Sequence, residues 1–254
     1  MQGSVSLPLP NPLEKDTFDM NHGTTLMAAA GSLLVTGAAT AGAFQSLSMT
    51  AYTGPRSGAP SNSVTYRLYA NLEIGARIDA VFADARGDIS ISTANGASFY
   101  HNPNGGPTSL DINSNFFSFV PSMEWDSYVS IGALYQNGAP FGENSFASVG
   151  IDWDQWESGG DIFSSQGLWN TGPDHVMGEE VGGQVFLGQF TVTDGVGDVS
   201  DLVGQLSLLG QDADGNVWEE VGVTWMESTD PAVPGIGALA PLACIGLVRR
   251  RRRG

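Results

Sequence analysis

Apolar and polar residues alternate along several segments in the middle of the chain. The clearest case is the segment 64–72, in which every second residue from Val64 to Leu72 is apolar or aromatic. A period of two places neighbouring side chains on opposite faces of a β-strand, so this segment predicts a strand with one buried face. Similar patterns occur in the segments 78–82, 89–92 and 127–134.

Two other features belong to the same kind of structure. The segment 185–192 is apolar on both faces, which is typical of a strand in the middle of a sheet. The segments 202–209 and 217–224 flank the turn residues 212–216, and the Asp-Gly pair inside that turn favours a β-hairpin. No part of the region 44–230 repeats its apolar residues with a convincing helical period.

These patterns predict an all-β fold, with a single, jelly-roll-like β-sandwich domain over residues 44–230. The 34 glycines and 13 prolines of the chain favour frequent turns between short strands. Residues 101–126 and 136–180 are expected to form longer connections. An N-terminal signal helix and a short C-terminal apolar helix are expected to flank the domain.

The N-terminal region has the layout of a secretory signal peptide. After Met20, a short polar piece leads into an apolar, alanine-rich stretch, and the small residues Ala41 and Ala43 offer cleavage positions. We therefore interpret residues 20–43 as a signal peptide and residues 1–19 as an extension that precedes the true start. The alternative is a buried, alanine-rich helix.

The chain ends with an apolar span and a basic cluster. Residues 236–248 are mostly apolar, and the cluster after them consists of Arg249, Arg250, Arg251, Arg252 and Arg253. The span is short for a stable membrane helix, and arginines stay on the cytoplasmic side. The segment 231–254 therefore predicts a brief stop in the inner membrane, with a core helix and a basic tail as the alternative.

This segment resembles a known class of sorting signal. Val233, Pro234 and Gly235 open a stretch that runs through the apolar span to the arginines. The layout is similar to the planctomycete variants of the PEP-CTERM signals, although the Pro-Glu-Pro motif itself does not occur. The resemblance implies export, a transient hold in the inner membrane, processing by an exosortase-type enzyme, and a final location in the cell envelope or outside the cell.

Charge is distributed unevenly along the chain. The net charge of −17 comes from 10 basic and 27 acidic residues, and half of the basic residues form the C-terminal cluster. The predicted domain has four arginines, no lysine and 24 acidic residues. Binding to phosphates requires basic side chains spread over a surface, so this distribution excludes a nucleic-acid partner. The single cysteine, Cys244, excludes an intramolecular disulfide bond and a cysteine-based zinc site.

One short segment combines acidic and aromatic residues. Residues 152–157 contain three acids and two tryptophans. The rings of Trp153, Trp156 and, further along, Trp169 suit stacking on sugars, which would make the domain a carbohydrate-binding module. Paired carboxylates in the same segment would suit a glycan hydrolase, provided that the fold held them at the required separation. The third interpretation is a surface loop whose indole rings pack on the sandwich.

A second candidate site lies in the predicted hairpin turn. Asp212, Asp214 and Asn216 place oxygen atoms at alternating positions around a glycine, a pattern that suits calcium. The same residues are also ordinary components of a turn, and the spacing is not that of an EF-hand loop. No other cofactor is predicted.

The body also resembles uncharacterised exported proteins of planctomycetes, in the segments 65–70, 116–132 and 183–192. That resemblance implies no particular activity. The features together predict an exported cell-envelope or extracellular-matrix protein without catalysis, sorted through its C-terminal tail. Its expected partners are the export machinery, an exosortase-type enzyme and, transiently, the inner membrane, with an extracellular polysaccharide as a candidate ligand.

Overall fold

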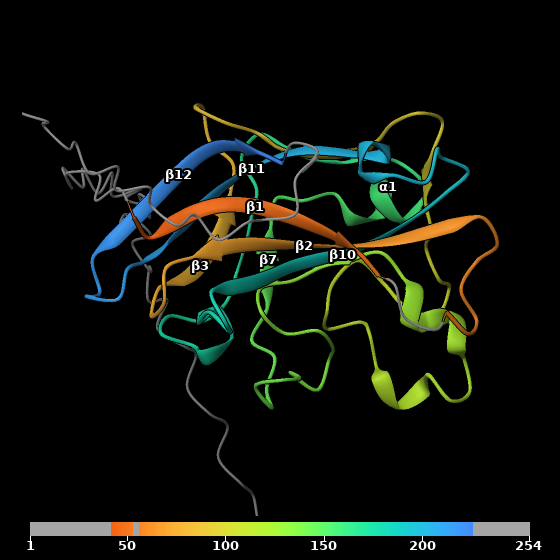
Figure 1. Ribbon diagram of the computed structural model, residues 1–254, viewed down its shortest axis with the longest axis horizontal. Helices are drawn as coiled ribbons and strands as arrows, with labels where there is room; N and C mark the ends of the chain where they lie inside the picture. The colour runs from red at the N-terminus through yellow and green to blue at the C-terminus, as the bar shows by residue number, and fades with distance from the viewer. Residues whose placement is uncertain (1–41, 53–55, 226–254) are drawn as a thin grey trace, which may run out of the picture. The chain divides into compact units, whose positions relative to one another are not determined.

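The computed structural model describes residues 42–52 and 56–225. The regular structure of the described part consists mainly of β-strands, which form two antiparallel sheets packed face to face (Figure 1). The prediction of an all-β sandwich is confirmed. The two predicted terminal helices, Ala41 and the C-terminal sorting segment lie outside the described residues.

The first sheet is centred on two long neighbouring strands, β2 and β10. Its strands are β1 (Phe44–Ala51), β2 (Ser63–Leu72), β10 (Gln184–Thr193), β5 (Ser98–Phe99) and β6 (Tyr128–Val129). They follow the order β1-β2-β10-β5, and β6 pairs with another part of β10. Strand β10 is buried on both faces along most of its length, as its apolar sequence predicts.

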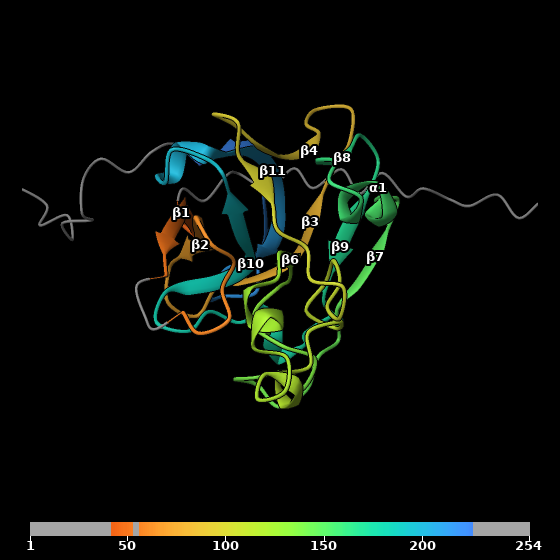
Figure 2. The same ribbon diagram turned by 90° about the vertical axis from the view of Figure 1, so that its right-hand side faces the viewer.

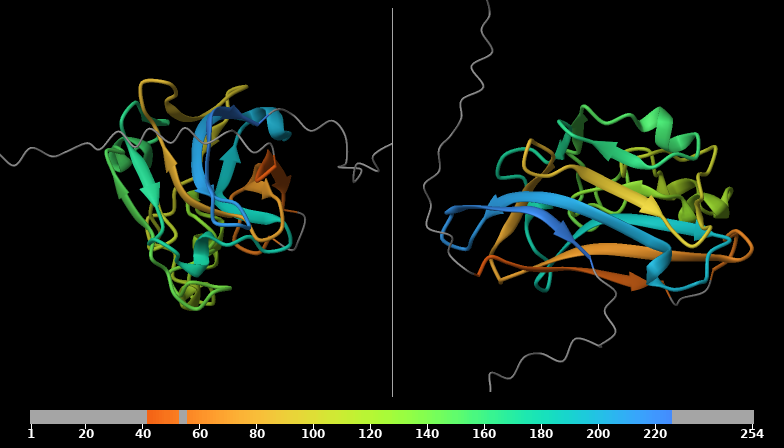
Figure 3. Two further views of the ribbon diagram at one scale, coloured as in Figure 1. Left: turned by 90° about the vertical axis from the view of Figure 1, so that its left-hand side faces the viewer. Right: turned by 90° about the horizontal axis from the view of Figure 1, so that it is seen from above.

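The second sheet is centred on β11, which β3 and β4 flank in succession and β12 joins as a hairpin. Its strands are β3 (Arg77–Phe82), β4 (Ile89–Thr93), β7 (Ala147–Val149), β8 (Ile162–Ser164), β9 (Leu168–Asn170), β11 (Leu202–Gln211) and β12 (Val217–Thr224). Strand β3 pairs with residues 207–211 of β11, and β4 pairs with residues 202–205. The β11–β12 hairpin confirms the predicted turn (Figure 3).

The main core lies between the two sheets. The alternation in β2 turns Tyr66 and Leu68 inward, where they meet Phe190 from β10 and Ile78 and Leu206 from the opposite sheet. All five residues are at most 1% exposed. Removal of apolar side chains of this size from water stabilises the fold by roughly 1.5–3 kcal/mol each. The period-two pattern therefore forms the strands and the core at the same time.

Two predicted connections contain more structure than expected. Residues 101–126 hold two short 3-10 helices, η1 (Ser114–Phe116) and η2 (Pro121–Trp125). Residues 136–180 hold strands β7, β8 and β9, as well as the 3-10 helix η3 (Val176–Gly178). The prediction of a long connection is wrong there, because strands of three residues are too short to show an alternation. Strand β1 was not predicted, and the predicted strand 127–134 is reduced to β6.

The helices of the described residues are short. Helix α1 (Trp153–Glu157) has five residues, and η4 (Val199–Asp201) is a single turn before β11. Within the described ranges, no helix has the length and apolar character needed to cross a membrane.

The other face of the first sheet carries a second, smaller core. The side chains of Ile112, Tyr128 and Phe186 form it, with Tyr69 and Tyr135 packed against them. Two of these residues come from the connections between β5 and β7, which lie beside β6 and β10 (Figure 2). Part of the outward face of β2 is therefore covered by connecting segments.

Candidate functional site

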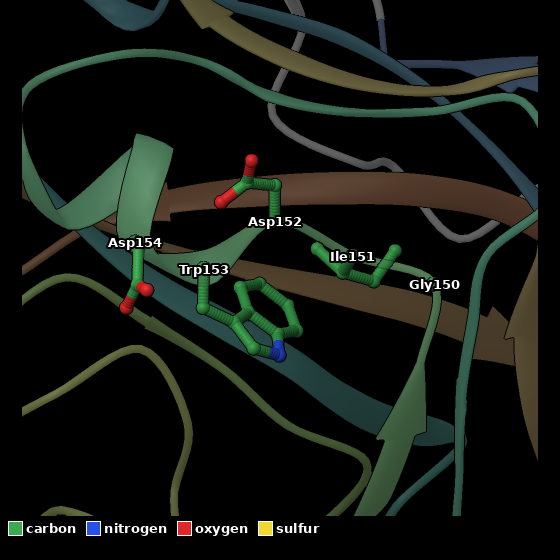
Figure 4. Close-up of a pocket in the computed structure, with 5 residues that line it drawn as sticks. All are labelled: Gly150, Ile151, Asp152, Trp153 and Asp154. Carbon is green, nitrogen blue, oxygen red and sulfur yellow. The ribbon is translucent and has the colours of Figure 1, made fainter.

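The segment that combines acids and tryptophans forms helix α1 and the turn before it. The side chain of Asp152 caps the helix by accepting a hydrogen bond from the backbone N–H of Gln155 at 3.0 Å. An open hollow of about 500 Å³ is lined by residues 150–154 (Figure 4). Trp153 lies in this hollow, where its indole N–H donates to Ser148 Oγ at 3.0 Å.

The three tryptophans do cluster, but two of them are inside the protein. The ring of Trp153 lies 5.9 Å from that of Trp156 and 6.3 Å from that of Trp169, measured between centroids. Trp156 and Trp169 are both 0% exposed. A sugar ring has no access to either face of a buried indole, so the prediction of a three-tryptophan stacking surface is wrong. Of the three, only Trp153 presents part of its ring at the surface.

The acidic side chains of α1 do not converge. The carboxylates of Asp152 and Asp154 point in different directions (Figure 4). Glu157 turns instead towards His101, with 3.2 Å between Oε1 and the imidazole Nδ1. Glycoside hydrolysis needs two carboxyl groups on opposite sides of one bond. This arrangement therefore gives no support to the glycan hydrolase alternative.

A buried carboxylate lies close to this pair. Asp126, 0% exposed, accepts backbone hydrogen bonds from Asn102 at 2.7 Å, Gly106 at 2.9 Å and Ser127 at 3.0 Å. A Cβ at Gly105 would come within 1.8 Å of its Oδ2 atom, so only glycine fits there. Asp126 thus holds together the Gly- and Pro-rich loop that precedes Thr108.

Burial raises the pKa of Asp126 from 3.8 to about 7, because desolvation of the carboxylate outweighs its N–H donors. The negative charge of Glu157 raises it further, while His101 opposes the shift. The His101 ring packs edge-on against Trp156, with 5.0 Å between centroids. Sequence reasoning did not find this group, because its three titratable residues come from three separate segments.

The candidate calcium residues form the turn between β11 and β12. The Asp212 carboxylate accepts hydrogen bonds from the backbone N–H of Asp214 and from both the backbone and side-chain nitrogens of Asn216, at 2.8–2.9 Å. These bonds lower the pKa of Asp212. In the part of the chain that the structure describes, no group of three or more His, Cys, Asp or Glu side chains is arranged to hold a metal ion. The geometry favours the turn over the calcium loop.

We expect the Asp212→Ala variant to melt a few degrees below the wild-type protein, because it removes all three side-chain acceptor bonds of the turn. The Asp214→Ala variant is the matched control, since Asp214 contributes a backbone N–H to these bonds. Thermal melts with and without millimolar calcium would check both. A calcium-dependent rise in melting temperature that disappears in both variants would instead establish a calcium site.

Sequence reasoning also missed a row of arginine and aromatic side chains, which we call the arginine–aromatic row: Arg56, Trp125, Tyr52 and Arg67. The Arg56 guanidinium lies 5.1 Å from the Trp125 ring, and that of Arg67 lies 5.5 Å from the Tyr52 ring. The two rings are 5.2 Å apart in an edge-on arrangement. The only signal in the sequence was the position of Arg67 among the outward residues of the 64–72 alternation.

Comparisons with known proteins give no match: no family model, no curated protein and no solved structure matches this chain. The similarity of the C-terminal segment to PEP-CTERM signals therefore stays a prediction. The resemblance of the body to exported β-proteins likewise assigns no role to any residue.

Proposed function

We propose that the chain is an exported protein of the cell envelope or extracellular matrix, which acts without catalysis and is sorted through its C-terminal tail. The supporting observation is where the folded domain begins and ends. Strand β1 begins at Phe44, directly after the predicted cleavage position Ala43, and β12 ends at Thr224, before the predicted tail at 231–254. Cleavage at both positions would leave every described strand intact.

The charge of the domain is consistent with this proposal. The region 44–230 is strongly acidic and has no lysine. A large net charge of one sign keeps protein molecules apart in water, which suits a domain released from the membrane. In this proposal, the positive charge that holds the chain at the inner membrane comes from the five arginines of the tail, which are removed with it.

The proposal predicts a mature protein that lacks residues 1–43 and most of residues 231–254. The measurement is the intact mass of the protein purified from cell fractions of the producing bacterium. A chain of full mass in the cytoplasm would contradict both the export and the processing.

A variant of the tail tests the sorting step separately. Replacement of the five arginines 249–253 by glutamine removes the charges that hold the tail on the cytoplasmic side. We expect this variant to lose its signal peptide but to keep the mass of the tail, because the processing enzyme no longer holds its substrate. Processing that is unchanged in the variant would show that the arginines have no part in sorting.

A further inference from the structure

The four arginines of the domain fall into two groups. Arg77 and Arg86 are paired with carboxylates, Arg77 with Asp79 at 2.7 Å and Arg86 with Asp84 at 2.5 Å. Arg56 and Arg67 form no ion pair with any described residue. Most of the charged residues of this domain are acidic, so it is unusual that two guanidinium groups have no carboxylate partner among the described residues.

Both groups are held in place by neutral partners. Arg67 donates from Nε to Gln189 Oε1 at 3.1 Å, across the β2–β10 pairing. Arg56 donates from Nη2 to the hydroxyl groups of Ser63 and Thr65, at 3.0 and 2.8 Å. A guanidinium group has five N–H donors, so Arg67 keeps donors for another acceptor. Arg56 also donates from Nη1 to the backbone oxygen of Ser63, and its Nε is buried, which leaves a single donor on Nη1. These bonds fix the positions of both guanidinium groups, and no described carboxylate pairs with either positive charge.

Trp125 is the buried member of the arginine–aromatic row. Its indole is 2% exposed and donates a hydrogen bond to the backbone oxygen of Ser57 at 2.8 Å. Arg56, Tyr52 and Arg67 are only partly buried, so they present polar and aromatic atoms at the surface above it. The row thus combines a rigid base with accessible charged groups.

Further aromatic rings extend the row beyond Arg67. Tyr69 follows Arg67 on the same face of β2. Burial raises the pKa of Tyr135, and the positive charge of Arg67 opposes this rise, which places the two side chains near each other. The Tyr135 ring contacts that of Phe117 at 5.2 Å. Nearby in the chain, Phe119 is 81% exposed. Tyr69 and Tyr135 are partly buried against the smaller core, so each exposes only part of its side chain. An exposed tyrosine ring face suits the C–H face of a sugar, and the hydroxyl group offers a hydrogen bond.

We propose that the arginine–aromatic row, with Tyr69 and Tyr135, binds an acidic polysaccharide in which isolated uronate residues are separated by neutral sugars. A guanidinium group matches a carboxylate in charge and in its planar, two-pronged geometry. The tyrosines would contact the neighbouring neutral rings. The strongly acidic remainder of the domain repels polymers with closely spaced negative charges, which excludes nucleic acids and dense polyuronates as the preferred ligand.

This binding surface is independent of the route by which the protein leaves the cell. A chain that stays in the cytoplasm could still bind the polysaccharide in vitro, and an exported chain could fail to bind it. The two proposals can therefore fail separately.

The test is isothermal titration calorimetry of the purified full-length chain with oligosaccharides of gellan, in which neutral sugars separate the glucuronates. The carboxyl-reduced form of the same oligosaccharides is the matched ligand control. We expect binding to the glucuronate form and about tenfold weaker binding to the reduced form, because a charged hydrogen-bonded pair is lost.

Variants locate the binding on the protein. Arg67→Ala is expected to weaken binding about tenfold, and Arg67→Lys less, because lysine keeps the charge but not the planar fork. Arg86→Ala removes an arginine already paired with carboxylates and is expected to leave binding unchanged. Thermal melts of each variant identify any that fails to fold, and Tyr135→Phe provides a milder change at the same surface.

Three results would overturn the proposal. One is equal binding to the carboxylated and the reduced oligosaccharides. Another is unchanged binding by a folded Arg67→Ala variant. The third is tighter binding to polygalacturonate or to single-stranded DNA than to the gellan oligosaccharides, which would mean that closely spaced charges are preferred.

Discussion

Replacement of Trp156 by alanine is expected to lower the free energy of unfolding by roughly 3–5 kcal/mol. The Trp156 ring is 0% exposed and contacts the rings of Phe99 and Phe190, at centroid distances of 5.7 and 6.3 Å. Removal of the indole takes away these contacts and leaves a cavity that rigid strands on both sides cannot close. Unfolding in urea, followed by tryptophan fluorescence and circular dichroism, would measure the loss.

Trp153→Ala is the matched control, because it removes the same side chain from the same helix. Trp153 is partly exposed at the hollow before α1, so its loss should cost about 1–2 kcal/mol. Equal losses for the two variants would contradict the assignment of Trp156 to the core. The pair of variants also separates a packing role from surface binding, since of these two rings only that of Trp153 could be reached by a ligand.

The second large effect is a pH dependence of stability that arises from Asp126. Its pKa is raised from 3.8 to about 7 in the folded protein, first by desolvation. Between these values the folded state binds a proton that the unfolded state has lost. The free energy of unfolding therefore falls as the pH rises from about 4 to about 7, by up to about 1.4 kcal/mol per pH unit from this group.

The Asp126→Asn variant should lose this decrease of the free energy of unfolding with pH, because asparagine does not titrate. Asparagine also nearly preserves the shape of the protonated acid. Urea unfolding at intervals between pH 4 and pH 8 would compare it with the wild type.

Asp84, Asp198 and Asp212 have lowered pKa values, because each accepts hydrogen bonds. Their contributions to the free energy of unfolding are therefore lost only as the pH falls towards more acidic values.

A second variant tests the cause of the shift. Glu157→Gln removes the negative charge that raises the pKa of Asp126, so the fall in stability should end at a lower pH than in the wild type. A slope that is identical in the wild type, Asp126→Asn and Glu157→Gln would assign the pH dependence to other groups.

Local sequence patterns were sufficient for the longest strands and their hairpin. The alternation in residues 64–72 predicts β2, and the doubly apolar segment 185–192 predicts β10. The turn residues 212–216 connect β11 and β12. In each case the information is local, because burial of one or both faces of a strand leaves a period that can be recognised within a few residues.

The candidate sites depended on contacts between distant segments. Trp153 and Trp156 are three residues apart, yet one lies at the surface and the other in the core. The difference arises because Phe99 and Phe190, from other strands, surround Trp156. Carboxylate spacing in the sequence could not show that Glu157 faces His101 while Asp152 caps its own helix.

By itself, the sequence determined the all-β class, the long strands, the hairpin and the acidity of the domain, because each follows from composition or from a pattern of neighbouring residues. Only the tertiary structure decided which tryptophans are buried, which short segments become β7, β8 and β9, and which arginines lack a carboxylate partner among the described residues. These outcomes depend on where strands and connections meet in space. Arg67 and Trp125 illustrate this, since residues far apart in the chain form one row only after the strands have paired and the connection has folded over the sheet.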